Sequence, residues 1–131
     1  MTRVVLDASA GVEIALQTPD GRRIESLLPQ PTTFWVPEHY FPEVAGVLRR
    51  NEINDRYPAA RVQAAFDRLL TAPTTSVAVK PLLAEAWTMR HNLTIADALY
   101  VVVAVHAGAV LATADMRLAN APNLPVETIT P

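Results

Sequence analysis

The sequence contains no cysteine and only one lysine, Lys80. The absence of cysteine excludes a disulfide framework, a thiolate metal site and a cysteine nucleophile, and it is consistent with a reducing cytosol. A long hydrophobic run is also absent, because the most apolar segment, residues 95–113, contains Asp97, His106 and Gly108. A membrane-spanning helix needs about 20 uninterrupted apolar residues, and the N-terminus has no basic region leading into an apolar signal core. We therefore expect a soluble, cytoplasmic protein with no membrane contact.

The charge balance gives no indication of a broad nucleic-acid-binding surface. The formal net charge is −2 and the isoelectric point is near 5.9, so no overall positive field would attract a polyanion. All basic residues except Lys80 are arginines. Arginine offers a rigid fork that suits phosphate or carboxylate groups, but a GC-rich genome would produce the same bias. Both interpretations of the arginines stay open.

Length and hydrophobic pattern predict a single α/β domain over residues 1–131. A chain of 131 residues, half of them hydrophobic, fits the usual size of roughly 100–200 residues per domain and can bury a sizeable core. Short apolar stretches predict strands at residues 4–6, 34–36, 74–79, 109–113 and 125–129. Apolar residues at helical spacing predict helices at residues 9–18, 20–28, 38–54, 59–72, 82–91 and 94–106. This alternation indicates a parallel sheet covered by helices on both faces.

Two features of the apolar pattern can each be interpreted in two ways. Residues 94–106 include three consecutive valines, which favour a strand, but the length of the segment and Thr94 as a ready N-cap favour a buried helix that Gly108 ends. The two tryptophans, Trp35 and Trp87, lie in apolar stretches of a predicted strand and a predicted helix. We expect both in the core rather than on a base-stacking surface.

Four carboxylates lie in otherwise apolar or small surroundings, namely Asp7, Glu43, Asp97 and Asp115. Asp7 and Asp115 end the first and fourth predicted strands. Asp97 lies near the start of the most hydrophobic helix, and Glu43 lies early in the helix at residues 38–54. In a right-handed βα arrangement all these positions belong to the carboxyl edge of the sheet. Desolvated carboxylates gathered there would repel one another, and a divalent metal would relieve the repulsion. All-oxygen ligands favour Mg²⁺ or Mn²⁺ over zinc.

Each of these acids also has a purely structural explanation. Asp7 and Asp115 precede helices and would serve as N-caps. Asp97 follows Thr94 at the spacing of an acidic capping box, and Glu43 is compatible with a solvated position on its helix. Capping, however, does not require that all of these positions fall at one edge of the sheet. The combination therefore favours a shared site.

Four segments of the chain contain or flank these acids. They are VVLDAS at residues 4–9, PE at 37–38 with PEVAGVL at 42–48, LTIADALY at 93–100 and LATAD at 111–115. In this order and at these separations, they resemble the PIN-domain ribonucleases, and more closely the VapC-type toxins of bacterial type II toxin–antitoxin pairs. The resemblance covers essentially the whole chain. It implies a three-layer PIN-like fold, with a five-stranded parallel sheet in the order 3-2-1-4-5 and helices on both faces. That order places Asp7 beside Asp115.

The resemblance also implies the site and its chemistry. The catalytic, metal-binding acids of the family match Asp7, Glu43, Asp97 and Asp115, and its hydroxyl residues that contact carboxylates or substrate match Ser9 and Thr113. We expect one or two Mg²⁺ or Mn²⁺ ions, with Asp7 as the central ligand. Asp97 and Asp115 would complete one metal site, while Glu43 would bind a second ion or orient the water. The implied reaction is endonucleolytic hydrolysis of RNA that leaves 5′-phosphate and 3′-hydroxyl ends.

The implied partners are RNA, a cognate antitoxin, and a second copy of the chain, either as a homodimer or in a heterotetramer or octamer with the antitoxin, in the bacterial cytoplasm. The predicted helices at residues 20–28, 38–54 and 59–72 are candidates for the protein-binding surfaces. One departure from the family concerns the residues that follow the last acid. The family commonly has Asp or Asn and then basic residues there, whereas this chain has only Arg117.

Other functional classes fit the sequence less well. A phosphorelay receiver domain would need an acidic neighbour beside Asp7 and a lysine after a late strand, and a haloacid-dehalogenase-type phosphatase would need a second aspartate where the chain has Ser9. The main alternative is a non-catalytic PIN-like module that binds RNA or protein. The full set of acids and hydroxyls argues against it.

The remaining polar residues have no assigned catalytic role. The arginines near the end of the helix at residues 38–54, namely Arg49, Arg50 and Arg56, would either contact RNA phosphates or form a solvated surface. The histidines, namely His39, His91 and His106, share no spacing typical of a metal site or an acid–base pair.

Overall fold

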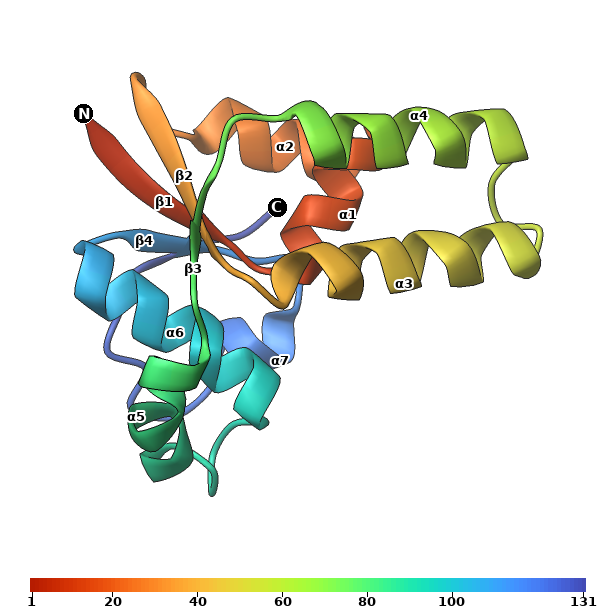
Figure 1. Cartoon of the computed structure of the whole chain (residues 1–131). Helices are drawn as coiled ribbons and strands as arrows, with labels where there is room; N and C mark the ends of the chain where they lie inside the picture. Colours follow the sequence, from red (N-terminus) through yellow and green to blue (C-terminus); the bar gives the residue numbers. More distant parts are fainter.

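Five parallel strands form one sheet in the order β3-β2-β1-β4-β5 in a computed structural model that describes residues 1–131 (Figure 1). The strands are β1 (Thr2–Leu6), β2 (Thr32–Pro37), β3 (Thr75–Val77), β4 (Val110–Ala112) and β5 (Thr128–Ile129). The central strand β1 pairs with β2 on one side and with β4 on the other, so that Val5 lies between Trp35 and Leu111. The predicted fold class and strand order are confirmed.

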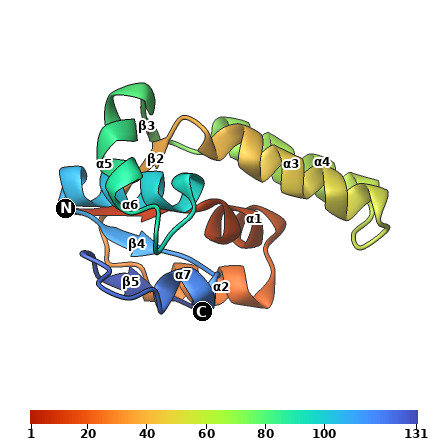
Figure 2. The same ribbon diagram turned by 90° about the horizontal axis from the view of Figure 1, so that it is seen from below.

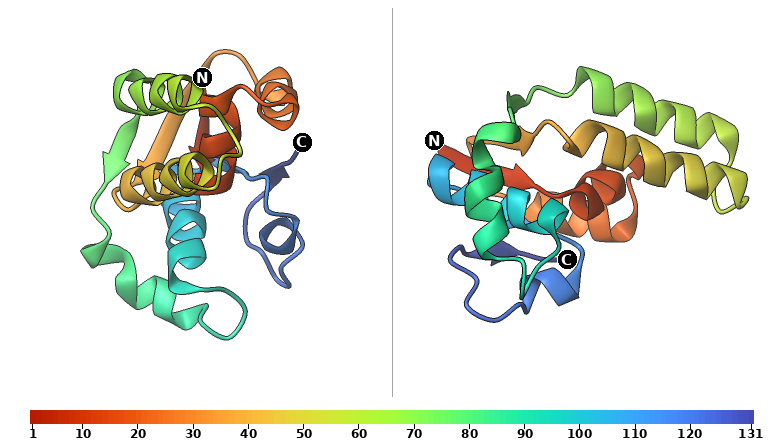
Figure 3. Two further views of the ribbon diagram at one scale, coloured as in Figure 1. Left: turned by 90° about the vertical axis from the view of Figure 1, so that its right-hand side faces the viewer. Right: turned by 60° about the horizontal axis from the view of Figure 1, so that its bottom comes forward.

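Helices cover both faces of the sheet. They are α1 (Ala8–Leu16), α2 (Pro19–Leu27), α3 (Tyr40–Ile53), α4 (Ala59–Thr71), α5 (Leu83–Thr88), α6 (Ile95–Ala107) and α7 (Met116–Ala119), with a 3-10 turn at Lys80–Leu82. The right-handed crossovers from β1 to β2 and from β2 to β3 place α1 to α4 on one side. The crossover from β3 back to β4 places α6 on the other side, where it packs against β1, β2 and β4 (Figure 3).

Helices α3 and α4 form a hairpin that extends well beyond the sheet (Figure 2). The base of α3 is held by Tyr40, Val44 and Leu48, which are buried at i, i+4 and i+8 along one face. Apolar side chains are also exposed on the hairpin: Ile53, near the tip, is 59% accessible, and Leu70, at the end of α4 that leads back to the sheet, is 64% accessible. All helices of the structure fall short of the length and hydrophobicity that a membrane-spanning helix needs.

The predicted buried helix near residues 94–106 is confirmed as α6. The Thr94 hydroxyl caps its start by accepting from the Asp97 N–H, and Gly108 ends it in the left-handed conformation with φ 61°. Every residue from Ala98 to Ala104 is buried, so its valines pack as a helix between the sheet and α5. Burial on nearly all sides overrides the strand preference of three consecutive valines.

Two features differ from the sequence-based prediction. The helix expected at residues 82–91 is only the short α5, and Trp87 on it is 59% exposed, with the Arg90 guanidinium 4.7 Å from the ring centroid. Because α5 lies at the edge of the fold, only its Ala86 side is fully covered by α6. The expectation that Trp87 is a core residue is wrong, whereas Trp35 on β2 packs against the core. The fifth strand pairs over Thr128–Ile129 only.

Candidate active site

The carboxyl ends of β1 and β4 bring Asp7 and Asp115 to the same edge of the sheet. These are neighbouring parallel strands, with Leu6 paired to Ala112, and the Asp7 N–H donates to the Ala112 carbonyl at 3.1 Å. Each aspartate is also the N-cap of the following helix, α1 for Asp7 and α7 for Asp115. The capping hydrogen bonds therefore orient both carboxylates, and both carboxylates remain at this edge of the sheet.

Asp7 is the most buried of the acids, with 3% of its surface exposed. Its Oδ1 accepts from the Ala10 N–H at 2.9 Å and from the Ser9 hydroxyl at 2.7 Å. Its Oδ2 accepts from the Thr113 hydroxyl at 2.5 Å. Three donors therefore hold the carboxylate in one orientation, which satisfies the requirement that a buried charge be hydrogen-bonded.

Ser9 and Thr113 connect the loops that follow β1 and β4. Their hydroxyl oxygens lie 3.2 Å apart. The Ser9 hydroxyl accepts from the Ala114 N–H at 2.9 Å, and the Thr113 hydroxyl accepts from the Asp115 N–H at 3.0 Å. The two hydroxyls predicted to support the acids thus lie between Asp7 and the backbone that carries Asp115.

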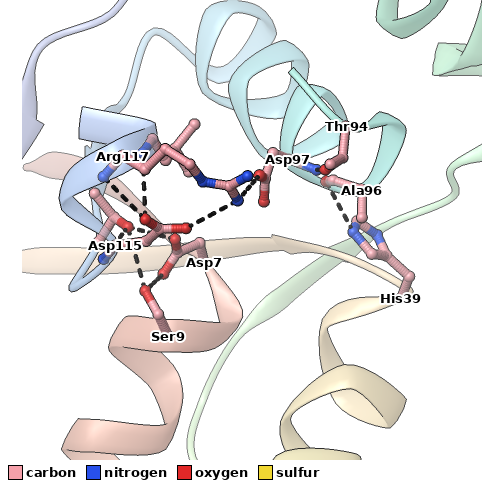
Figure 4. Close-up of polar contacts among 10 residues, drawn as sticks. Asp7, Ser9, His39, Thr94, Ala96, Asp97, Asp115 and Arg117 are labelled. Atoms are coloured by element: carbon pink, nitrogen blue, oxygen red, sulfur yellow. Dashed lines mark hydrogen bonds and ion pairs between the residues drawn. The ribbon is translucent and has the colours of Figure 1, made fainter. Parts of the chain in front are cut away.

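Asp97 faces Asp7 and Asp115 from the first turn of α6 (Figure 4). One guanidinium nitrogen of Arg117 lies 3.5 Å from Asp97 Oδ2 and 3.5 Å from Asp115 Oδ2. Arg117 is 75% exposed, so it reaches the two carboxylates from the solvent side. A single cationic group therefore lies between two of the predicted metal ligands.

Glu43 lies on the first turn of α3, and its charge interacts with that of Asp97. Its Oε2 is 3.6 Å from His39 Nε2, which also lies 3.1 Å from the Ala96 carbonyl. The His39 ring packs against Tyr100, with ring centroids 4.7 Å apart. His39 thereby joins the starts of α3 and α6, which carry Glu43 and Asp97.

The electrostatics of the site disfavour a full set of negative charges. Burial raises the pKa of Asp7 above its ordinary value of 3.8, against the lowering effect of its three hydrogen bonds, and the charge of Asp97 raises it further. Burial is also the main cause of the raised pKa of Asp97, with a contribution from Asp115. The pKa of Glu43 is raised by burial and by Asp97. A bound cation would offset both the cost of burying these charges and the smaller repulsion between them.

The donor set fits a hard divalent cation, although the side chains are not closed around one. No three Asp, Glu or His side chains of the chain are positioned to hold a metal ion together. The available ligands are carboxylate and hydroxyl oxygens, which suit Mg²⁺ or Mn²⁺. Asp97 and Asp115 interact, as do Asp7 and Asp97, and Glu43 and Asp97. To hold a metal ion together, the four carboxylates would have to move closer to one another and displace Arg117 from between Asp97 and Asp115.

The arginines of the α3–α4 hairpin and His106 make no contact with this site. Arg49, Arg50 and Arg56 are exposed on the α3–α4 hairpin. His106 pairs instead with Glu85 at 2.8 Å, linking α6 to α5. Sequence reasoning missed His39 and Tyr100, whose only available signals were a histidine four residues before Glu43 and a tyrosine three residues after Asp97.

Comparison with known proteins identifies relatives over nearly the whole chain. The PIN domain family model matches residues 4–124. Ribonuclease VapC3 of Mycobacterium tuberculosis is 39% identical over 119 residues, which cover 91% of this chain and 87% of the relative. Among solved structures, PAE2754 from Pyrobaculum aerophilum superposes with a TM-score of 0.70 at 21% identity, covering 98% of this chain and 84% of that one. VapBC2 from Rickettsia felis, solved bound to a DNA fragment from its promoter, gives a TM-score of 0.64 at 14% identity, with 97% and 98% coverage.

Proposed function

The chain belongs to the PIN domain family, and we propose that it is a Mg²⁺- or Mn²⁺-dependent endoribonuclease that acts as the toxin of a toxin–antitoxin pair. Ribonuclease VapC3, 39% identical over 91% of the chain, supports the ribonuclease activity. The observation that carries the proposal is the convergence of Asp7, Asp97 and Asp115, three acids far apart in sequence, at one edge of the sheet with Arg117 between two of them.

We assign Asp7, Asp97 and Asp115 as ligands of one divalent ion, with Glu43 binding a second ion or orienting the attacking water. A divalent ion held there would lower the pKa of a water and neutralise charge that develops on the scissile phosphate. A water would attack phosphorus, the bond from phosphorus to the 3′ oxygen would break, and the 3′ oxygen would take up a proton to replace the one that the water loses. This leaves a 5′-phosphate on one fragment and a 3′-hydroxyl on the other.

The remaining residues act on the carboxylates. Ser9 and Thr113 donate to opposite oxygens of Asp7 and hold it in one orientation. Such hydrogen-bonded support typically affects metal affinity or activity about 10- to 100-fold. Arg117, once displaced from Asp97 and Asp115, would be free to contact the RNA backbone. Its guanidinium lies 3.5 Å from a carboxylate oxygen of each of these two acids.

The proposed partners are RNA, a protein antitoxin and a second copy of the chain. The antitoxin is inferred from the VapC relationship and from the similar fold of VapBC2. Exposed apolar side chains on the α3–α4 hairpin, including Ile53 and Leu70, offer surface for a protein partner. We further propose that residues 1–131 act as one domain in the bacterial cytoplasm.

Cleavage of end-labelled structured RNAs tests this function. Wild-type protein, Asp97→Asn and Asp115→Asn are compared in Mg²⁺, in Mn²⁺ and in EDTA, with Asp20→Asn on α2 as a matched exposed control. We expect cleavage by the wild type and the control in either metal, none in EDTA, and a loss of at least about 100-fold in the two site variants. Cleavage in EDTA, or full activity in both site variants, contradicts the mechanism. Folded wild type that cleaves no RNA but binds it tightly indicates the non-catalytic alternative.

A further inference from the structure

The Tyr100 hydroxyl is buried beside the acid site without a hydrogen bond. The residue is 0% exposed, and its hydroxyl has no partner within hydrogen-bonding geometry. A buried hydroxyl left unpaired destabilises the folded state, whereas a phenylalanine of the same shape would not. The large majority of buried polar side-chain atoms in folded proteins are paired. The unpaired hydroxyl therefore calls for an explanation.

Tyr100 lies next to two of the acids. It follows Asp97 by three residues on α6, so both side chains project from the same side of that helix. Its ring packs against His39, whose Nε2 lies 3.6 Å from Glu43 Oε2 and 3.1 Å from the Ala96 carbonyl. His39 therefore contacts both residues: its ring packs against the Tyr100 ring, and its Nε2 lies near the Glu43 carboxylate.

The charges around the hydroxyl favour its protonated, hydrogen-donating form. Burial raises the pKa of Tyr100, and the negative charges of Glu43 and Asp7 raise it further. The Tyr100 hydroxyl is close enough to the Glu43 carboxylate to lower the pKa of Glu43, against the stronger raising effect of burial, although the two groups do not meet in hydrogen-bonding geometry. Glu43 is 35% exposed on its side chain, so its carboxylate has room to move while the tyrosine does not.

We propose that Tyr100 is a positioning residue whose hydroxyl donates to the Glu43 carboxylate when Glu43 turns towards a divalent ion bound by the acids. With an ion held by the acids, Glu43 would turn inward, the hydroxyl would gain the partner that it lacks, and one carboxylate oxygen of Glu43 would be fixed. The unpaired hydroxyl is thus a donor held ready for the metal-bound state. This inference rests on the proposed function, because it requires the acids to bind a metal.

The substitution Tyr100→Phe separates this role from a structural one. The variant removes only the hydroxyl, so we expect an unchanged or higher melting temperature in EDTA. In the same protein we expect Mn²⁺ to bind about tenfold more weakly by calorimetry and kcat for RNA to fall about tenfold, with KM for RNA unchanged. Tyr57→Phe, on the α3–α4 hairpin, is the matched control and should match the wild type in metal affinity and in catalysis.

A double-mutant cycle with Glu43→Gln tests whether the hydroxyl acts through Glu43. We expect Tyr100→Phe to have no further effect on Mn²⁺ affinity in a protein that already carries Glu43→Gln. Wild-type Mn²⁺ affinity and kcat in Tyr100→Phe overturn the inference, as does a fall in Mn²⁺ affinity that is fully additive with Glu43→Gln. If the wild type binds no Mn²⁺, the proposed function itself fails. Metal binding by the wild type with no change in Tyr100→Phe overturns only the role of Tyr100.

Discussion

The Thr113 hydroxyl donates to Asp7 Oδ2 at 2.5 Å, across a sequence separation of 106 residues. The bond joins the carboxyl ends of β1 and β4, which are the neighbouring strands that carry Asp7 and Asp115. Thr113 is fully buried and accepts from the Asp115 N–H as well. One side chain therefore determines where two of the proposed metal ligands lie relative to each other.

Thr113→Val should destabilise the protein, because it removes a donor to a buried carboxylate and an acceptor for a backbone N–H while keeping the side-chain shape. We expect the free energy of unfolding to fall by about 1–3 kcal/mol in urea denaturation. Thr113→Ser keeps the hydroxyl and should recover most of this loss. Equal destabilisation by the two substitutions would show that the methyl group, and not the hydroxyl, matters.

Arg117→Gln should increase affinity for divalent metal, because the guanidinium occupies the position between Asp97 and Asp115. Since Arg117 is largely exposed, each ion pair is worth at most about 1 kcal/mol, and we expect Mn²⁺ to bind about two- to fivefold more tightly. Calorimetric titration measures the change. Arg22→Gln on α2 removes the same charge away from the site and should leave the affinity unchanged; a similar gain in that variant would indicate a general charge effect.

The free energy of unfolding of the metal-free protein should fall as the pH rises above the unfolded pKa of its buried carboxyl groups. The pKa of Asp97 is raised by burial, so the folded state binds the proton more tightly than the unfolded state does. This contribution is fully present below the unfolded pKa of 3.8 and is lost as the pH rises through the folded pKa. Asp97→Asn should therefore raise the melting temperature in EDTA at pH 7 but have little effect at pH 4. A lower melting temperature for this variant at pH 7 would contradict the sign of the shift.

Two glycines in helices should respond oppositely to alanine. A Cβ on Gly21 in α2 would lie 2.1 Å from the Glu13 carbonyl oxygen of α1, a backbone atom that cannot move away cheaply. Gly21→Ala should therefore cost about 1–3 kcal/mol of stability. A Cβ on Gly46 in α3 has only Arg50 nearby at 3.9 Å, and Gly46→Ala should stabilise by about 0.5–1 kcal/mol. Chemical denaturation of both variants measures the change in the free energy of unfolding. Similar changes in the two variants would contradict the close packing of α1 on α2.

The parts of the fold that could be predicted from sequence are those where local signals and burial agree. The β1 segment is a short apolar run that ends in Asp7, and α6 has a hydroxyl cap at Thr94 and a glycine stop at Gly108. The α5 region could not be predicted in the same way. Its apolar residues formed a stripe, but whether Trp87 is buried depends on the position of α6 and the edge of the fold, which no local pattern encodes.

In the candidate site, too, only the features that depend on local sequence could be predicted. The position of each acid at the end of a strand or the start of a helix was predictable, and the structure brings Asp7, Asp97 and Asp115 together as expected. His39 and Tyr100 were not identified, because their importance comes from contacts between α3 and α6, such as the His39 Nε2 to Ala96 carbonyl distance of 3.1 Å. The Arg117 bridge likewise depends on the turn of α7 that directs the side chain back over Asp97.

The central claim is that these acids hold a divalent metal ion, and X-ray diffraction from crystals soaked in Mn²⁺ tests it most directly. Anomalous scattering locates Mn²⁺ independently of any assumption about the site. The account predicts a strong anomalous peak among the carboxylate oxygens of Asp7, Asp97 and Asp115, with the Arg117 guanidinium moved away from Asp97. At saturating Mn²⁺, no peak among these carboxylates, with Arg117 still between Asp97 and Asp115, would contradict it.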